Sequence, residues 1–228
     1  RRRTAELDAA QHHVVHCLAR AAEFRDNDTG RHIVRVGLYS GLIARQLGLG
    51  EDFSQLIEQA AKLHDVGKIG IPDAVLLKTG KLDADEFREM QKHCDLGLHV
   101  IHDKSDNDLS LLRRHSQMGA SILDQADTPL LRMASQIALT HHERWDGAGY
   151  PLRLQGDAIP LVGRIVAVAD VFDALSTRRV YKPAFPLDRC FEILIEGRGT
   201  QFDPRVLDAF LARREEAIAI QIRHADAE

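Results

Sequence analysis

The hydrophobic positions along this chain follow the period of an α-helix in almost every segment. Apolar residues recur at spacings of about three and four residues, which is the pattern of a helix with one buried face. We find no convincing stretch of alternating apolar and polar residues of the kind that predicts a β-strand. The pattern therefore predicts an all-α helical bundle of about eight to nine helices.

Turn and capping residues mark the ends of these predicted helices. Thr128 and Pro129 are typical of a helix start, as capping residue and first-turn proline, and the Asp203-Pro204 pair is a similar start signal. Asp52 is the predicted cap of another helix. The predicted helices cover residues 4–24, about 30–47, 52–65, 89–101, 111–123, 128–142, 160–175, 187–196 and 204–224.

Two of the predicted helices resemble each other. Residues 89–101 (EMQKHCDLGLHVI) and 111–123 (LLRRHSQMGASIL) share a His-x-x-x-Gly pattern and a trailing isoleucine at an offset of 22 residues. This similarity indicates a tandem duplication of one helical unit. Residues 1–24 are polar and rich in alanine, so we interpret them as a linker helix that leads into one domain of residues 25–228.

Composition and charge exclude several classes of function. The net charge is −4 and the only run of basic residues is Arg1-Arg2-Arg3, which argues against a surface for a nucleic-acid polymer. No apolar run reaches membrane-spanning length and no signal peptide is present, so we expect a cytoplasmic protein. The three cysteines lie far apart and match no zinc or redox spacing, which fits a reducing compartment.

The chain is rich in histidine, with twelve residues of this type. Histidine is the commonest metal ligand in proteins. Asp170 interrupts the apolar stretch RIVAVADVFDAL, where a carboxylate is costly unless it is paired or bound to a metal. Together the candidates supply nitrogen and oxygen ligands for at least two divalent ions: His32, His64, Asp65, one histidine of the duplicated helices, His141, His142 and Asp170.

Four motifs, in order, resemble the HD-GYP domain, the cyclic di-GMP phosphodiesterase branch of the HD metal-dependent phosphohydrolase superfamily. They are HDVGKIGIPD (64–73), HHERWDGAGYP (141–151), ADVFDALSTRRVYK (169–182) and GTQFDP (199–204). The resemblance runs from Arg25 to about Phe210. A lone His-Asp pair would carry little weight, whereas the ordered set is specific.

The resemblance implies a metal ligand set. One ion would be held by His32, His64, Asp65 and Asp170, and Asp65 would bridge to a second ion held by His141, His142 and a histidine of the duplicated helices.

That last ligand is either His93 or His115, because each lies at a suitable separation from one of the flanking motifs. We favour His115, which makes roughly 82–104 an inserted helix and leaves His93 at the surface or in packing. Asp28 stands where trinuclear members carry a glutamate for a third ion. Aspartate is shorter, so the resemblance implies two ions and supports a third only weakly.

The resemblance also implies roles toward a substrate. Asp65 and Lys68 would act in catalysis, with Lys68 meeting a substrate phosphate. Further substrate contacts would come from Gly149, Tyr150, Asp173, Arg179 and Lys182. For Trp145 we favour packing of the GYP loop over stacking on the substrate.

The implied activity is hydrolysis of cyclic di-GMP to pGpG, and in some members to GMP, by a hydroxide that bridges two metal ions. Iron is preferred on the resemblance, while manganese, nickel or zinc would also suit a His/Asp ligand set. Two alternatives stay open: an HD phosphohydrolase acting on another nucleotide, and a non-catalytic cyclic-dinucleotide sensor or docking module. The implied partners are an upstream receiver or sensor domain, a second copy of the chain and a diguanylate cyclase.

Overall fold

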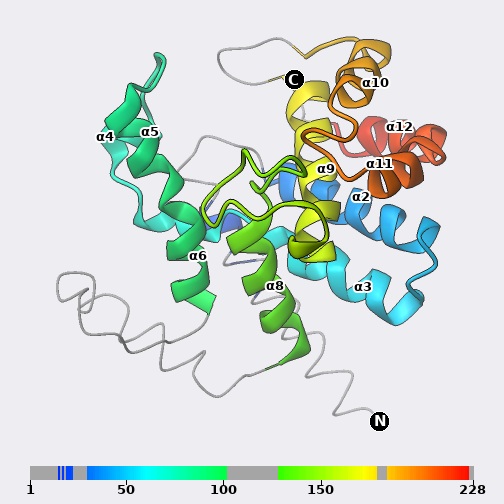
Figure 1. Ribbon diagram of the computed structural model, residues 1–228, viewed down its shortest axis with the longest axis horizontal. Helices are drawn as coiled ribbons and strands as arrows, with labels where there is room; N and C mark the ends of the chain where they lie inside the picture. Colours follow the sequence, from blue (N-terminus) through cyan, green and yellow to red (C-terminus); the bar gives the residue numbers. More distant parts are fainter. Residues whose placement is uncertain are drawn as a thin grey trace.

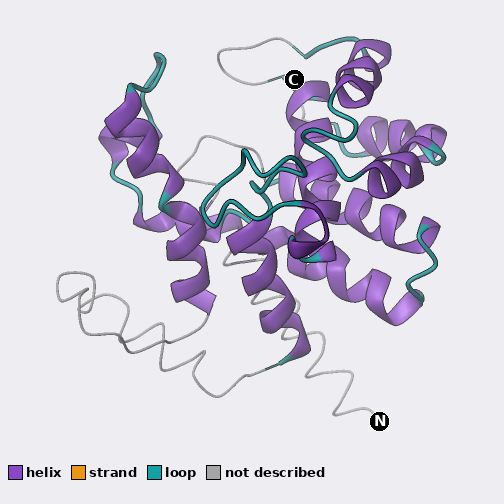
Figure 2. Cartoon of the chain, viewed as in Figure 1, coloured by secondary structure: helices purple, strands orange, loops and turns teal. Residues whose placement is uncertain are grey.

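The computed structural model describes residues 15, 17, 19–22, 30–101, 128–178 and 184–225 of the 228. These residues form helices and loops, and they contain no β-strand, only one isolated bridge between Arg198 and Phe202 (Figures 1 and 2). The described α-helices number ten, and they are α2 (His32–Gln46), α3 (Glu51–Ala60), α4 (Asp73–Leu76), α5 (Ala84–Gln91), α6 (His93–Ile101), α8 (Pro129–Thr140), α9 (Leu161–Ser176), α10 (Leu187–Glu196), α11 (Pro204–Leu211) and α12 (Arg214–Arg223). The all-α prediction is confirmed for this part of the chain.

Helices α2, α8 and α9 form the middle of the bundle. Helix α2 packs on α3, α9, α11 and α12, while α8 packs on α3, α6 and α9. Helices α4 and α5 lie at one side of the molecule, far from α10 to α12 at the other (Figure 1). Helix α6 connects the α4–α5 side to the bundle through its contacts with α8 and with the short 3₁₀ helix η2 (Val66–Gly70).

Aromatic side chains fill the core between α2, α9, α10 and α11. Tyr39, Phe172, Phe191 and Phe210 are almost fully buried, and their neighbouring ring centroids lie 5.0–6.1 Å apart. Large buried rings contribute much of the apolar area that folding removes from water. This core holds the site-bearing helices α2 and α9 against each other.

Several predicted helix boundaries are confirmed and others are wrong. The structure confirms helices close to the predicted 30–47, 128–142, 160–175 and 187–196. The helix predicted over 52–65 instead begins at Glu51 with Gly50 as its cap, ends at Ala60 and tightens into the 3₁₀ helix η1 (Ala61–Leu63). The helix predicted over 204–224 is split into α11 and α12.

The segment predicted to be an inserted helix near 82–104 differs most. It contains two helices, α5 and α6, and α6 packs closely on η2 and α8. Helix α5 begins with a capping box in which Asp83 and Glu86 each bind the other's backbone. Most of the linker 1–24 and all of 111–123 lie outside the described residues. No helix in the described ranges has the length and apolar character needed to cross a membrane.

The aromatic core predicts a large effect of truncation on stability. Phe210→Ala should lower the free energy of unfolding by about 3–5 kcal/mol, because it leaves a cavity beside Tyr39 and Phe172. Ile222→Ala, at a side chain that is 65% exposed, is the control and should change it by less than about 0.5 kcal/mol. Urea denaturation measures both, and similar effects of the two variants would contradict the core assignment.

Candidate metal centre and substrate pocket

The His64-Asp65 pair lies where α3 ends in a tight turn. The 3₁₀ helix η1 directly precedes His64, whose backbone N–H donates to the carbonyl of Ala61. The change from α to 3₁₀ geometry alters the direction of successive side chains. As a result His64, which is fully buried, and Asp65 both take part in the same centre.

Asp65 belongs to a first group of potential metal donors with three histidines. One donor atom from each member lies within 4.8 Å of the others, and the members are Asp65, His93, His141 and His142. The Oδ1 atom of Asp65 is 3.3 Å from His93 Nε2 and 3.4 Å from His141 Nε2. The side chains come from the turn after η1, from α6 and from the end of α8.

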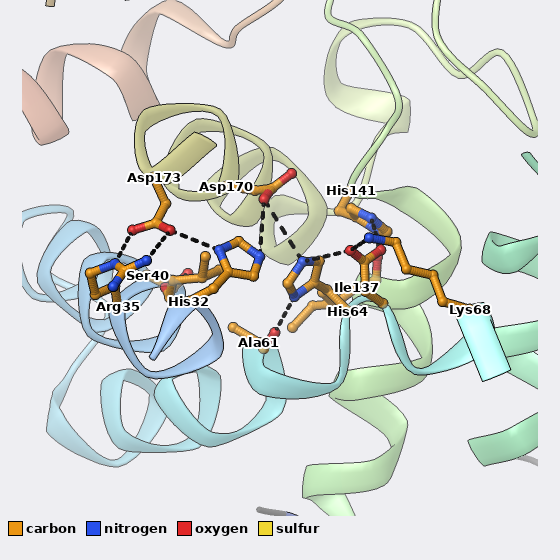
Figure 3. A network of polar contacts seen from close by, with 12 residues as sticks. His32, Arg35, Ser40, Ala61, His64, Lys68, Ile137, His141, Asp170 and Asp173 are labelled. Atoms are coloured by element: carbon orange, nitrogen blue, oxygen red, sulfur yellow. Dashed lines mark hydrogen bonds and ion pairs between the residues drawn. The ribbon is translucent and has the colours of Figure 1, made fainter. Parts of the chain in front are cut away.

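A second group of donors adjoins the first. It consists of His32 on α2, His64 and Asp170 on α9, again with donor atoms within 4.8 Å of one another. Asp170 Oδ1 lies 3.6 Å from His32 Nε2 and 3.8 Å from His64 Nε2 (Figure 3). The Oδ2 atom of Asp65 is 3.3 Å from His64 Nε2, so the two oxygens of this carboxylate face different groups.

The donor histidines are oriented by hydrogen bonds from their other ring nitrogen. The Nδ1 atoms of His64, His93 and His141 bond to backbone carbonyls at 2.7–3.0 Å. A carbonyl only accepts, so each Nδ1 carries the proton and each Nε2 is left to bind a metal. Three rings are therefore held in the tautomer that a metal site requires.

His32 is oriented by a buried salt bridge instead. Its Nδ1 lies 2.8 Å from Asp173, which also accepts two bonds from the guanidinium of Arg35, at 2.6 and 3.0 Å. Asp173 is 1% exposed, so its expected contact with a substrate is wrong: it holds His32 in place (Figure 3). Sequence reasoning missed Arg35. This arginine lies one turn after His32 in a largely apolar helix, so it is a charged residue in an apolar stretch, as Asp170 is.

The electrostatics around Asp65 favour positive charge. Burial alone would raise the pKa of its carboxyl, but Lys68, whose Nζ is 2.8 Å away, and His64 hold that pKa well below its ordinary value. Burial likewise opposes protonation of His64, yet Asp65 and Asp170 outweigh it and raise the pKa of that imidazole. The centre thus presents carboxylates that stabilise a neighbouring cation.

Two histidines of the first group, His93 and His142, are favoured in the neutral form by their surroundings. Burial, with a smaller contribution from His141, lowers the pKa of His93. Burial and the adjacent His141 also lower the pKa of His142, well below its ordinary value. Neutral imidazole is the form that binds a metal ion.

Buried atoms without a hydrogen-bond partner test whether metal ions fit this centre. Among the described residues, His64 Nε2, His141 Nε2 and Asp65 Oδ1 are buried and have no such partner. Leaving a buried polar atom unpaired costs about 1–3 kcal/mol, so such atoms are rare. Divalent cations would satisfy all three atoms, and the nitrogen and oxygen donors suit them. The residues fit a metal centre.

The structure places His93 in the first donor group, where it is buried, and not at the surface. Helix α6 approaches so closely that a Cβ on Gly67 would lie 1.8 Å from the carbonyl oxygen of His93. The glycine of the HDVGK motif therefore allows His93 to reach Asp65. This placement goes against the expectation that His93 lies at the surface or in packing, while His115 lies outside the described residues.

A pocket of about 780 Å³ opens beside the centre, within the size range of small-molecule sites. His141, His142 and Asp170 contribute to its wall, as do the expected substrate residues Gly149 and Tyr150. The ring of Tyr150 stacks on His142 with centroids 4.8 Å apart. Helix α5 supplies Phe87, Arg88 and Gln91, which sequence reasoning missed because nothing in the sequence relates α5 to the distant GYP motif. Asp28, Arg179 and Lys182 lie outside the described residues.

The GYP loop is anchored by the acid of the HHE motif. Glu143 is buried, and its two carboxylate oxygens accept from the backbone N–H groups of Leu152 and Leu154. Trp145 packs near the guanidinium groups of Arg164 and Arg205, at 5.6 and 5.9 Å, which agrees with the packing role favoured for it. The GYP loop, which forms part of the pocket wall, is therefore held in place by these contacts.

Comparisons with known proteins agree with this geometry. The profile of the HD domain family matches residues 98–206. A protein of Vibrio cholerae named cyclic di-GMP phosphodiesterase is 46% identical over 92% of this chain and 41% of its own length. The response regulator RpfG of Xanthomonas campestris, also named a cyclic di-GMP phosphodiesterase, is 43% identical over 92% of this chain and 50% of its own length.

Other relatives extend the comparison. A 3'3'-cGAMP-specific phosphodiesterase of Vibrio cholerae is 41% identical over 95% of this chain and 37% of its own length, so the chain spans half or less of these three relatives. Among solved structures, a HDG"Y"P protein of Bdellovibrio bacteriovorus shares the fold with a TM-score of 0.56 and 17% identity, covering 82% of this chain and 54% of that one. The chain therefore matches the HD domain family over residues 98–206 and carries the sequence motifs of its HD-GYP branch.

Proposed function

We propose that this chain is a metal-dependent phosphodiesterase that hydrolyses cyclic di-GMP to linear pGpG. One observation carries the proposal: the carboxylate of Asp65 lies between two groups of histidines beside a pocket of about 780 Å³. The arrangement combines a site for two cations with space for a nucleotide.

The relatives support a cyclic dinucleotide as the substrate class. Three of them, from Vibrio cholerae, Xanthomonas campestris and Thermotoga maritima, are named cyclic di-GMP phosphodiesterases at 41–46% identity. Another at 41% is named for 3'3'-cGAMP, which makes that dinucleotide the second candidate. RpfG is named a response regulator, which supports our proposal of an upstream receiver domain. A homodimer and a diguanylate cyclase contact remain proposals from the family resemblance.

We assign one ion to His32, His64 and Asp170, and a second to His93, His141 and His142, with Asp65 shared between them. Two such ions would supply Lewis acidity at this site, toward a water molecule and toward a substrate phosphate. Iron is our proposal for the element, on the basis of the family resemblance. The donor set also accepts manganese, nickel or zinc and does not select among them by itself.

The chain's own residues would then position the substrate. Lys68 places its ammonium group beside Asp65, where it can donate to a phosphate oxygen. Tyr150, held by its stacking on His142, gives the pocket an aromatic wall, and Gly149 lets the loop pass close to Glu143. Arg179 and Lys182 remain proposed phosphate ligands from the family motif.

Activity should depend on the histidines of the centre. With added Fe(II) or Mn(II), the protein should convert cyclic di-GMP to pGpG, and chelation with EDTA should abolish turnover. His64→Ala should lower kcat by about two orders of magnitude or more, because it removes a ligand of one ion. Chromatography of the products measures the rate and separates pGpG from GMP.

His224→Ala is the matched control, since His224 belongs to neither donor group. It should retain wild-type turnover. Equal activity of His64→Ala and the wild type would contradict the proposed chemistry, and binding of intact cyclic di-GMP without product would favour a sensor.

Metal stoichiometry should separate His93 from His115. The wild type should hold about two ions per chain, and His93→Ala should lose about one, because it removes a donor from the first group. His115→Ala should keep about two. Elemental analysis of the purified variants gives both numbers, and loss of metal in His115→Ala alone would reverse the assignment.

A further inference from the structure

Arg153 has an unusual backbone conformation at the edge of the pocket. Its φ is +55°, in the left-handed region that favours glycine, and it is the one residue other than glycine with a positive φ in the described part of the chain. A residue other than glycine is strained in this region, and the conformation persists only where its surroundings impose it. Since glycine would fit this backbone without strain, the presence of arginine at the position needs an explanation.

The surroundings do impose this conformation. Glu143 binds the backbone N–H of Leu152 through Oε1 at 2.6 Å and that of Leu154 through Oε2 at 3.0 Å. These bonds fix the residues on both sides of Arg153, and Glu143 is itself 3% exposed. The two hydrogen bonds to Glu143 thus act as a clamp on this part of the loop. The clamp places the side chain of residue 153 at the pocket, where Arg153 is part of the lining.

The other basic side chains of the pocket lining are already paired with acids. Each lies in an ion pair with an acidic residue two or three positions away in the sequence, and the pairs are Arg88–Asp85, Lys92–Glu89 and Arg144–Asp146. Their charges are partly neutralised before any ligand arrives. Arg153 differs, because its guanidinium has no ion pair or hydrogen bond to another described residue.

We propose that Arg153 binds the second, non-reacting phosphate of the cyclic dinucleotide. This inference rests on the proposed function. A cyclic dinucleotide carries two phosphodiesters, and only one can lie at the metal centre during reaction. The other needs a cation elsewhere in the pocket, and a guanidinium that pairs with no other described residue matches phosphate oxygens in charge and geometry. Glu143 is the positioning residue that holds Arg153 toward it.

Arg153→Gly is a sharp test because the change removes the side chain while relieving the backbone. The melting temperature should stay the same or rise, since glycine is favoured at this φ. KM for cyclic di-GMP should rise about tenfold or more, the size expected for one charged hydrogen-bonded contact, with a smaller change in kcat. Hydrolysis of bis(p-nitrophenyl) phosphate, which has a single phosphate, should be unchanged.

Matched variants isolate the contact. Arg153→Lys keeps the charge and should recover part of the affinity. Arg223→Ala removes one positive charge from α12, whose residues do not line this pocket, and should leave KM at the wild-type value. Cyclic di-AMP, which has the same two phosphates, should lose affinity for Arg153→Gly by the same factor as cyclic di-GMP.

Each other outcome overturns the proposal. An unchanged KM for cyclic di-GMP in an active Arg153→Gly protein contradicts this inference while leaving the proposed function intact. A loss confined to guanine-containing substrates shows base recognition instead of phosphate binding. Equal loss on bis(p-nitrophenyl) phosphate, or a lowered melting temperature, shows a structural role. A wild-type protein that neither binds nor hydrolyses cyclic dinucleotides contradicts the proposed function and this inference together.

Discussion

The site depends on one largely buried carboxylate, that of Asp65, which two sets of histidines share. Asp65 directs Oδ1 to His93 and His141 and Oδ2 to His64, so a single side chain joins donors from the turn after α3, from α6 and from α8. A buried carboxylate is unfavourable without compensating positive charge. In this protein Lys68 supplies part of that charge, and bound cations would supply the rest.

The surrounding hydrogen bonds make this centre rigid before any ligand binds. Backbone carbonyls on α5, α8 and η1 hold three of the imidazoles, and the Arg35–Asp173 pair holds His32 from inside the bundle. Such partners fix both the tautomer and the direction of each ring. The cost of burying charged groups so close together is offset by the aromatic core between α2 and α9, which also holds the helices of His32 and Asp170 against each other.

The loop after α8 connects the metal centre to the pocket and is also held in place by hydrogen bonds. His141 and His142 end the helix as donors, and Glu143 directly after them turns inward to bind the loop at Leu152 and Leu154. Three consecutive residues thus join the centre to the wall that would contact a substrate. The left-handed conformation of Arg153 follows from that clamp and not from its own preference.

The sequence by itself determined the helical class and most of the donor residues. Helical periodicity is local, and the His64-Asp65, His141-His142 and Asp170 motifs are visible because charged or metal-binding residues stand out in apolar stretches. Only the tertiary structure decided what depends on packing between distant segments. His93 and His115 have the same local pattern, and the approach of α6 to Gly67 brings one of them to Asp65. Asp173 lies one turn after the donor Asp170 on the same helix. Its buried pairing with Arg35 on another helix assigns it a supporting role. The sequence could not show this pairing, because periodicity carries no information about which helices meet.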